Sequence, residues 1–181
     1  MKRYFLSALF IVFSFNANAE NIFVPYIGID GIYNKSKLYN SHSDNYGANF
    51  NVGTSYNKYF GTELFYAQVG SNAKAINLDQ KYKVSYRAYG LDAVVYAPIC
   101  SYFDLTTNLG IGAYTLKEKQ TGISHSSDEG YGYRFGGGFI YHITPALAVR
   151  FVARYVNFDH ISNADHMAEY AFGFRYNFIK D

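Results

Sequence analysis

The chain of 181 residues contains one cysteine, three prolines and no tryptophan. Because Cys100 is the single cysteine, no intramolecular disulfide can form. We expect its thiol, which follows Pro98 and Ile99, to be packed in a turn. Beyond the N-terminal segment, no stretch approaches the roughly twenty continuous apolar residues that a membrane-spanning helix needs. Any insertion into a membrane must therefore use β-strands.

An excess of charge is also missing. The sequence has 16 basic and 14 acidic side chains, and the predicted leader contains two of the basic ones, Lys2 and Arg3. The mature chain is then formally neutral, so it lacks the electrostatic footprint of a nucleic-acid-binding protein. We expect no nucleic-acid partner.

The N-terminus has the features of a cleaved signal peptide. Lys2 and Arg3 precede an apolar run over residues 4–15, and Ala17-Asn18-Ala19 supplies small residues for cleavage. We therefore expect residues 1–19 to be removed on export. Residues 20–181 have a length that suits one domain.

Near the C-terminus, alternate residues form two contrasting sets. One set is wholly aromatic, and the other carries charge, amide and small side chains. A period of two predicts a β-strand. A soluble sheet buries its apolar face, whereas a closed barrel in lipid turns it outward and keeps a polar interior. The aromatic set consists of Tyr170, Phe172, Phe174, Tyr176 and Phe178.

The same alternation predicts an all-β, eight-stranded antiparallel up-and-down transmembrane barrel. Three connections are short, around residues 57–60, 98–102 and 142–145. Four are longer and polar, as expected for extracellular loops opposite short periplasmic turns: residues 34–45, 71–80, 116–129 and 156–167. The predicted strands lie roughly over residues 22–33, 46–56, 60–66, 82–95, 105–113, 132–141, 147–155 and 169–178.

The fourth predicted strand changes its parity. Tyr82, Val84 and Tyr86 share one face, whereas Tyr89 and Leu91 share the other. Either a bulge interrupts the strand near residues 87–88, or its first part extends beyond the bilayer. We favour the extension because a membrane strand needs only about ten residues.

Charged residues fall on the inward parity of the predicted strands. An eight-stranded barrel has room inside for side chains but not for a channel. We expect four carboxylates to face four guanidinium groups and to form a paired network that plugs the lumen, because unpaired buried charge is costly. An ion path is the alternative. The network residues are Asp30, Glu63, Asp92, Arg134, Arg150, Arg154, Glu169 and Arg175.

Four short motifs occur in order along the mature chain: Tyr26-Ile27-Gly28-Ile29, Phe60-Gly61-Thr62-Glu63-Leu64, Tyr131-Gly132-Tyr133-Arg134-Phe135-Gly136-Gly137-Gly138 and Ala171-Phe172-Gly173-Phe174-Arg175-Tyr176-Asn177-Phe178. On these residues the chain resembles the outer membrane protein A-like β-barrel domain family. That family includes small opacity-type antigens and adhesion or invasion barrels.

The resemblance implies a monomeric, non-enzymatic protein of the bacterial outer membrane that needs no cofactor. Its loops would serve envelope integrity, adhesion or another surface interaction with a host or surface ligand. The family also implies a C-terminal signal for the barrel-assembly machinery, here Phe174, Tyr176 and Phe178, although three residues follow it. Lipids and lipopolysaccharide are the implied neighbours, with candidate contacts at Lys35, Lys37, Tyr39, Lys117 and Lys119.

An enzyme is the rival class. Lipid A deacylases are also eight-stranded barrels, and His160-Ile161-Ser162-Asn163 resembles their His-x-Ser-Asn element, with Glu169 as the carboxylate. A serine nucleophile needs an adjacent base and an orienting acid. However, Glu169 follows Ser162 more closely than that family's pattern places it, and its parity directs it inward.

A soluble barrel and a metal site in the loops are further hypotheses. A lipocalin-like barrel would bury the aromatic face and expose the strand arginines to water. Imidazole and carboxylate ligands would suit zinc or copper, but the loop histidines lack the close spacing of a rigid site. The candidate ligands are His42, His125, His160 and His166, with Asp44, Asp128, Asp159 and Asp165 nearby.

Overall fold

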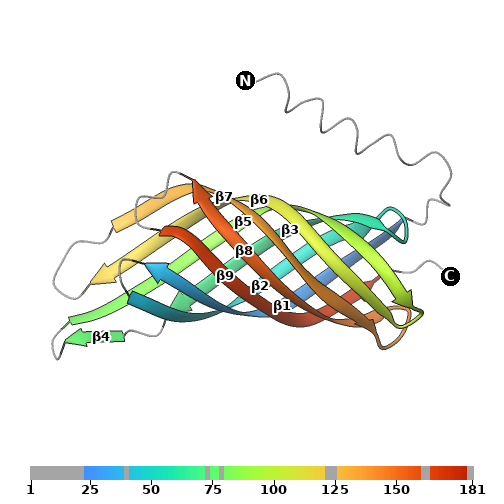
Figure 1. The fold of residues 1–181 in the computed structure, drawn as a ribbon, viewed down its shortest axis with the longest axis horizontal. Helices are drawn as coiled ribbons and strands as arrows, with labels where there is room; N and C mark the ends of the chain where they lie inside the picture. Colours follow the sequence, from blue (N-terminus) through green and yellow to red (C-terminus); the bar gives the residue numbers. More distant parts are fainter. Residues whose placement is uncertain are drawn as a thin grey trace, which may run out of the picture.

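The computed structural model describes residues 23–38, 41–71, 74–77, 80–120, 126–159 and 164–178. The predicted leader lies outside these ranges. Nine strands appear in the described residues (Figure 1): β1 (Val24–Leu38), β2 (Ser41–Ser55), β3 (Phe60–Ser71), β4 (Lys74–Asn77), β5 (Gln80–Cys100), β6 (Phe103–Gln120), β7 (Ser126–His142), β8 (Leu147–Asp159) and β9 (Ala164–Asn177).

Eight of these strands close into an antiparallel barrel. Neighbours in the chain pair with each other, β1 also pairs with β9, and β3 pairs with β5. The ninth, β4, is a short strand that pairs with β5 at the end of the barrel where the long connections lie (Figure 1). The predicted eight-stranded up-and-down barrel is confirmed. The described residues include no helix long and apolar enough to span a membrane.

The long connections are shorter than predicted, because the strands continue into all four of them. The β1–β2 ladder, for example, runs without interruption to the pair Leu38 and Ser41, well inside the predicted loop 34–45. Likewise, β6 continues to Gln120 and β9 begins at Ala164. Beyond the bilayer the outward face of a strand contacts water instead of lipid, so the outward apolar residues disappear although the backbone pairing and the buried inward face continue. We call the end of the barrel with the four long connections the loop end, and the opposite end, with the three short connections, the turn end.

The parity change in β5 does not come from a bulge. Its pairs with β3 are continuous from Phe60–Val95 to Gly70–Ser85, and its ladder with β6 is regular over the same residues. The bulge alternative is therefore wrong, and β5 continues unbroken through residues 85–95; that its first part extends beyond the bilayer stays a prediction. A consequence of the unbroken strand is that Tyr86 points into the barrel, where its side chain is buried.

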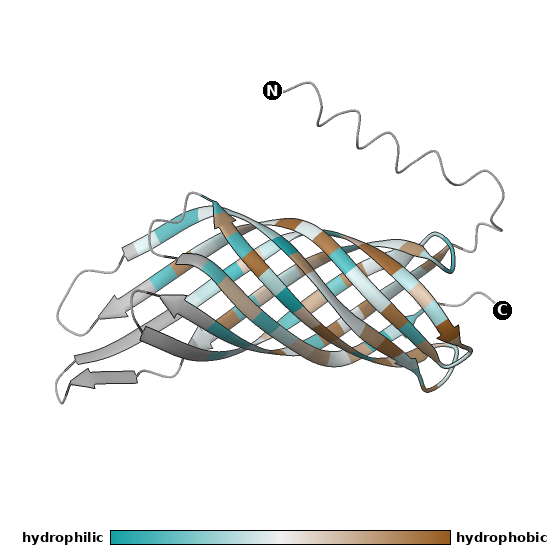
Figure 2. Ribbon diagram, in the orientation of Figure 1, coloured by the Kyte–Doolittle hydropathy of each residue, from teal (hydrophilic) through white to brown (hydrophobic). Residues whose placement is uncertain are grey.

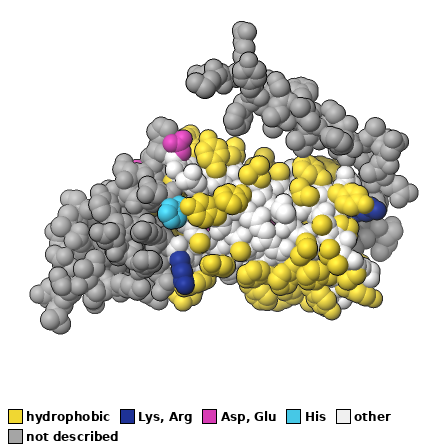
Figure 3. Space-filling view, viewed as in Figure 1, with side chains coloured by type: hydrophobic (Ala, Val, Ile, Leu, Met, Phe, Trp, Pro, Cys, Tyr) yellow, Lys and Arg dark blue, Asp and Glu magenta, His cyan; other side chains and the backbone are white. Residues whose placement is uncertain are grey.

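The outer wall is apolar, as the alternation predicted. Leu109, Leu64 and Phe172 are 67%, 60% and 57% exposed, whereas Arg134 is 1% exposed. Figure 2 shows hydrophobic and hydrophilic positions alternating along the strands, and in Figure 3 hydrophobic side chains cover much of the visible wall. The soluble alternative is wrong, because it requires the reverse arrangement.

Exposed aromatic residues mark two levels on the wall. Near the loop end most of the rings are tyrosines, and the side chain of Tyr33 packs on Tyr46 and Tyr170 with centroid distances of 5.3 and 6.3 Å. Tyrosine suits a membrane–water boundary because its ring is apolar and its hydroxyl is not. The exposed members of this tyrosine girdle are Tyr46, Tyr66, Tyr89, Tyr131, Tyr133, Tyr155 and Tyr170; the turn end has Tyr59, Tyr102, Tyr141, Tyr176 and Phe178.

Candidate functional site

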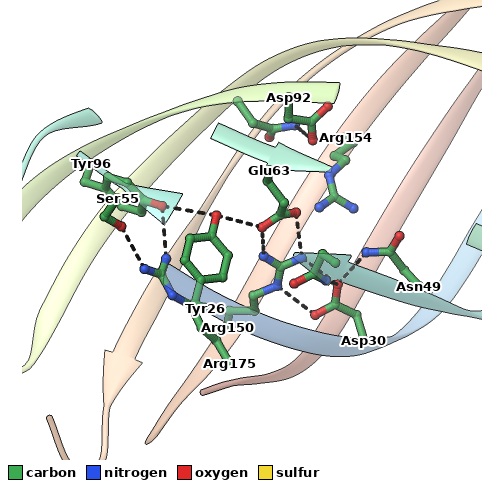
Figure 4. Close-up of polar contacts among 12 residues, drawn as sticks. Tyr26, Asp30, Asn49, Ser55, Glu63, Asp92, Tyr96, Arg150, Arg154 and Arg175 are labelled. Atoms are coloured by element: carbon green, nitrogen blue, oxygen red, sulfur yellow. Dashed lines mark hydrogen bonds and ion pairs between the residues drawn. The ribbon is translucent and has the colours of Figure 1, made fainter. Parts of the chain in front are cut away.

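The candidate site is the charged lumen, which is built from the inward positions of six strands. All eight predicted network residues are buried, with exposures between 1% and 5%. Strand register places some of them side by side, because Glu63 pairs with Asp92 across β3 and β5, and Arg154 pairs with Glu169 across β8 and β9. Figure 4 shows the side chains converging inside the barrel.

Arg150 joins two carboxylates from different strands. Its Nε and Nη2 donate to Oδ1 and Oδ2 of Asp30 at 2.7 and 2.6 Å, and its Nη1 donates to Glu63 Oε2 at 2.6 Å. Asp30 Oδ2 also accepts from the amides of Asn49 and Asn51. This bidentate geometry stabilises charges that burial would otherwise penalise (Figure 4).

A second bidentate pair joins Arg134 and Asp92. Nε of Arg134 donates to Oδ1 at 2.7 Å, and Nη2 donates to Oδ2. The guanidinium carbon lies 3.3 Å from the ring centroid of Phe65, which places the planar group against an aromatic face. Asn108 donates to the same carboxylate at 3.3 Å.

A fourth ion pair, between Arg154 and Glu169, lies closer to the loop end. Arg154 Nη1 donates to Glu169 Oε1 at 2.8 Å, and the hydroxyl of Tyr86 donates to Oε2 at 3.1 Å. The same hydroxyl accepts from Asn34 at 3.0 Å, and Asn45 donates to Asn34 in turn. Hydrogen bonds thus connect this carboxylate to inward residues of β1 and β2.

Arg175 departs from the expected pairing of four acids with four bases. No carboxylate of the described residues forms an ion pair with it. Its three hydrogen bonds go to neutral acceptors, namely Tyr96 at 3.0 Å, Ser55 at 2.9 Å and Asn177 at 2.7 Å. Its guanidinium also lies 3.5 Å from the ring centroid of Tyr26. Three arginines therefore hold all four carboxylates.

Inward glycines make space for the carboxylates. A Cβ at Gly110 would overlap Asp92 Oδ1, and a Cβ at Gly173 would lie 2.6 Å from Asp30 Oδ1. Each glycine sits directly beside its acid in the ladder, in the pairs Asp92–Gly110 and Asp30–Gly173. Inward glycines in the sequence therefore mark where the neighbouring strand carries a buried carboxylate, at Asp92 and Asp30.

The lumen also contains a group of buried apolar residues that the sequence did not predict. Most of them lie on inward positions of the strand extensions, toward the loop end from the charged network, whereas Ile32, Phe65 and Ala171 lie within the predicted strands. Carrying the inward parity into the extensions would have predicted the group. We call this group the apolar layer; it comprises Ile32, Phe65, Ala67, Val69, Tyr86, Ala88, Tyr114, Leu116, Val156, Met167 and Ala171.

The described residues do not assemble the deacylase site or the metal site. His160 and Ser162 lie outside the described residues, and Glu169 is held in the lumen by Arg154 rather than facing a loop. Of the metal candidates, His166 stacks on Tyr155 at 5.4 Å. Where side chains are described, no group of three or more histidines, cysteines or acids could hold a metal ion. The side chains of His42, Asp44, His125 and Asp165 are outside that part.

Two terminal features complete the turn end. Cys100 is exposed, so the expectation of a packed thiol is wrong; the residue ends β5 at the rim of the barrel, where few neighbours cover it. The backbone N–H of Phe178 donates to Pro25 at 2.8 Å and so continues the seam between β9 and β1. The rings of Phe174, Tyr176 and Phe178 all face outward.

Comparisons with known proteins agree with this architecture. The sequence profile of the outer membrane protein beta-barrel domain matches residues 5–178, and no curated protein sequence matches the chain. The chain is similar to Ail, the attachment invasion locus protein of Yersinia pestis, at 18% identity and a TM-score of 0.64, covering 86% of this chain and 98% of that one. Neisserial surface protein A is 16% identical with a TM-score of 0.72, and the match covers 85% of this chain and 97% of that one. OprG from Pseudomonas aeruginosa is 16% identical with a TM-score of 0.59, and the match covers 87% of this chain and 96% of that one. At these identities the likeness shows a shared fold.

Proposed function

Because this chain belongs to the outer membrane protein beta-barrel domain family, and so lies in the bacterial outer membrane, we propose that it is a non-enzymatic surface protein. Its barrel is a rigid, monomeric scaffold that presents the loop end to the outside. Binding sites commonly lie on loops that a rigid scaffold positions. Envelope integrity and surface interaction or adhesion are the roles that this arrangement suits.

The buried lumen carries the proposal. Four ion pairs formed by Arg134, Arg150 and Arg154 lie across its middle, and the apolar layer lies mostly between them and the loop end. The cavity beside the ion pairs measures about 20 Å³, which is space for roughly one water molecule. We infer that a lumen filled in this way by the described residues leaves no path for solutes, so that the protein acts through its outer surfaces.

Conductance in planar bilayers tests the plugged lumen. We expect the purified protein to give no stable conductance steps, because an ion would have to displace bidentate pairs in a low-dielectric space. The variant R150A/R154A removes two plugging side chains and serves as the comparison; it should leak more than the native barrel. Large, stable steps from the native protein would rule out the plug.

A polyanionic glycan is the ligand class that the loop end suits. One structure of Ail holds the heparin analogue sucrose octasulfate. Here the exposed, outward cations near the loop end include Lys35, Arg87 and Lys117. A cation near an anionic surface contributes about 1 kcal/mol. We therefore propose that sulfated or phosphorylated glycans, lipopolysaccharide among them, bind this rim.

Binding to immobilised heparin and to lipopolysaccharide tests the rim. The triple variant K35Q/R87Q/K117Q should lose most of the binding at physiological salt, whereas K58Q at the turn end should bind like the native protein. Equal loss in both variants would show that the attraction depends on total charge and not on the rim.

The lipid A deacylase remains a testable rival. We expect S162A to leave the acyl pattern of lipid A unchanged in mass spectra of expressing cells, because the nearby carboxylate of Glu169 is buried and paired. A pattern that depends on Ser162 would overturn the non-enzymatic assignment.

A further inference from the structure

The turn end of the barrel is hollowed by a pit of about 350 Å³. Its lining comes from β1, β2, β5, β6, β7 and β9 and from two turns, so the pit lies on the barrel axis and not on the lipid-facing wall. In an outer-membrane barrel the short turns face the periplasm. The pit is therefore open to periplasmic solutes, and its volume lies within the range of about 300–1,000 Å³ of small-molecule sites.

Arg175 forms the inner wall of this pit. Arg175 is 5% exposed. Like Tyr96, it lines both the pit and the 20 Å³ cavity deeper in the lumen. These two side chains therefore separate the pit from the charged network. Figure 4 shows the guanidinium held between Ser55 and Tyr96 and beside Tyr26.

The guanidinium of Arg175 is positioned but not neutralised. Three of its five N–H groups donate to Tyr96, Ser55 and Asn177, all of them neutral, which leaves two N–H groups for another acceptor. The nearest carboxylate along its hydrogen bonds is Glu63, reached through Tyr96 and Tyr26, and Arg150 already holds that carboxylate. The other three lumen arginines are each paired directly with an acid.

The remaining charges around the pit leave an excess of positive charge. Lys58 stands at the rim, with its Nζ 5.0 Å from the ring centroid of Tyr59. The acidic residue of the lining is Asp104, and Nε2 of His142 lies 2.8 Å from its carboxylate. An anion that enters the pit would therefore meet Arg175 and Lys58, while the negative group is engaged by its own neighbour.

We propose that this pit binds a small soluble oxyanion, a carboxylate or phosphate group, on Arg175 from the periplasmic side. Arginine offers paired N–H donors that match the geometry of both groups. Burial strengthens that attraction because the local dielectric is low. This site is separate from the loop-end function proposed above, and either can fail without the other.

Thermal unfolding in micelles of an uncharged detergent tests the site, with inorganic phosphate exchanged for chloride at constant ionic strength. A ligand that binds only the folded state raises Tm with its concentration. We expect this rise in the native protein and in E129Q, whose carboxylate is exposed on the outer face of β7 and belongs to neither proposed site. In R175Q the apparent affinity for phosphate should fall at least tenfold, and in K58Q less. An equal rise in R175Q, or no rise in the native protein, would overturn the proposal.

Side-chain NMR of arginine keeps the test independent of how well R175Q folds. In native protein labelled with 15N-arginine, the Nε–Hε signal of Arg175 should shift saturably with phosphate or acetate. The signal of Arg134, which is paired with Asp92, should not. A lipid source is separated by repeating the measurement in phosphate-free vesicles with and without phosphatidylglycerol. A response to that lipid without a response to soluble phosphate would refute the soluble ligand, as would no shift at all.

Discussion

Asp92 shows how a single lumen residue depends on its neighbours. Its two oxygens accept from Arg134 and Asn108, and Gly110 leaves the space that the carboxylate occupies. Breaking a buried pair is costlier than never having formed it, because the remaining charge has no water and no partner. The inward parity of the strand predicted where the carboxylate points. It did not predict which arginine binds the carboxylate, because that depends on the register of β5, β6 and β7, which brings Asp92, Gly110 and Arg134 into line.

The substitution Asp92→Asn should destabilise the barrel by about 3–5 kcal/mol, since it leaves Arg134 buried without an anion. Urea unfolding in lipid vesicles, followed by far-UV circular dichroism, measures the change. E129Q on the outer face of β7 is the matched control and should change stability by less than about 0.5 kcal/mol. The double variant D92L/R134M should recover most of the loss. A double variant less stable than D92N would contradict this account.

The strands were predictable only where they cross the bilayer. Between the two aromatic levels one face meets lipid and the other meets the lumen, so the sequence alternates strictly. In the extensions the outward face meets water instead of lipid, so an outward residue such as Lys35 is polar, while the inward face stays buried, as at Asn45. The sequence therefore predicted eight strands and their facing but not their full length. For the same reason it missed Tyr86 and the apolar layer.

Lipid contact in the middle of a strand makes a specific prediction for Leu109. This side chain is 67% exposed and lies on β6 between the two aromatic levels. Leu109→Arg should cost about 2–4 kcal/mol, whereas Tyr102→Arg at the turn end should cost about 0–1 kcal/mol, because the penalty for a cation falls toward the interface. Unfolding in vesicles compares the two. Equal costs would mean that the wall does not cross the bilayer at this level.

The last strand carries the proposed assembly signal. Phe178 is 48% exposed, so its removal should change folded stability little. We nevertheless expect Phe178→Ala to lower the amount of folded barrel in cells several-fold, measured by heat-modifiable migration in gels. Phe172→Ala, a more exposed ring on the same face of β9, is the control and should assemble normally. If both variants lowered the amount of folded barrel equally, the loss of any exposed aromatic ring would explain the defect. If Phe178→Ala also refolded less well than Phe172→Ala in detergent, lower stability would explain it.

The whole molecule has two unlike ends. The loop end has the strand extensions, the tyrosine girdle and the apolar layer, whereas the turn end has short connections and the axial pit. Charge balance also has to be judged at this scale. Four acids and four arginines sum to zero over the lumen, as the sequence suggested, yet their positions leave Arg175 without an ion pair to any of those four carboxylates. Composition predicted the sum, and only the closed barrel showed how it is distributed.

The single native cysteine permits a direct test of orientation. Cys100 is exposed at the turn end, and a periplasmic position would hide it from a membrane-impermeant maleimide outside the cell. We expect labelling of Cys100 only after the outer membrane is permeabilised, with a mild reductant present to keep the thiol free. In a C100S background, K117C at the loop end should label in intact cells, because Lys117 is exposed on β6. Labelling of Cys100 in intact cells without labelling of K117C would show that the barrel has the opposite orientation in the membrane. The oxyanion pit would then open to the outside, and the cationic rim of Lys35, Arg87 and Lys117 would face the periplasm.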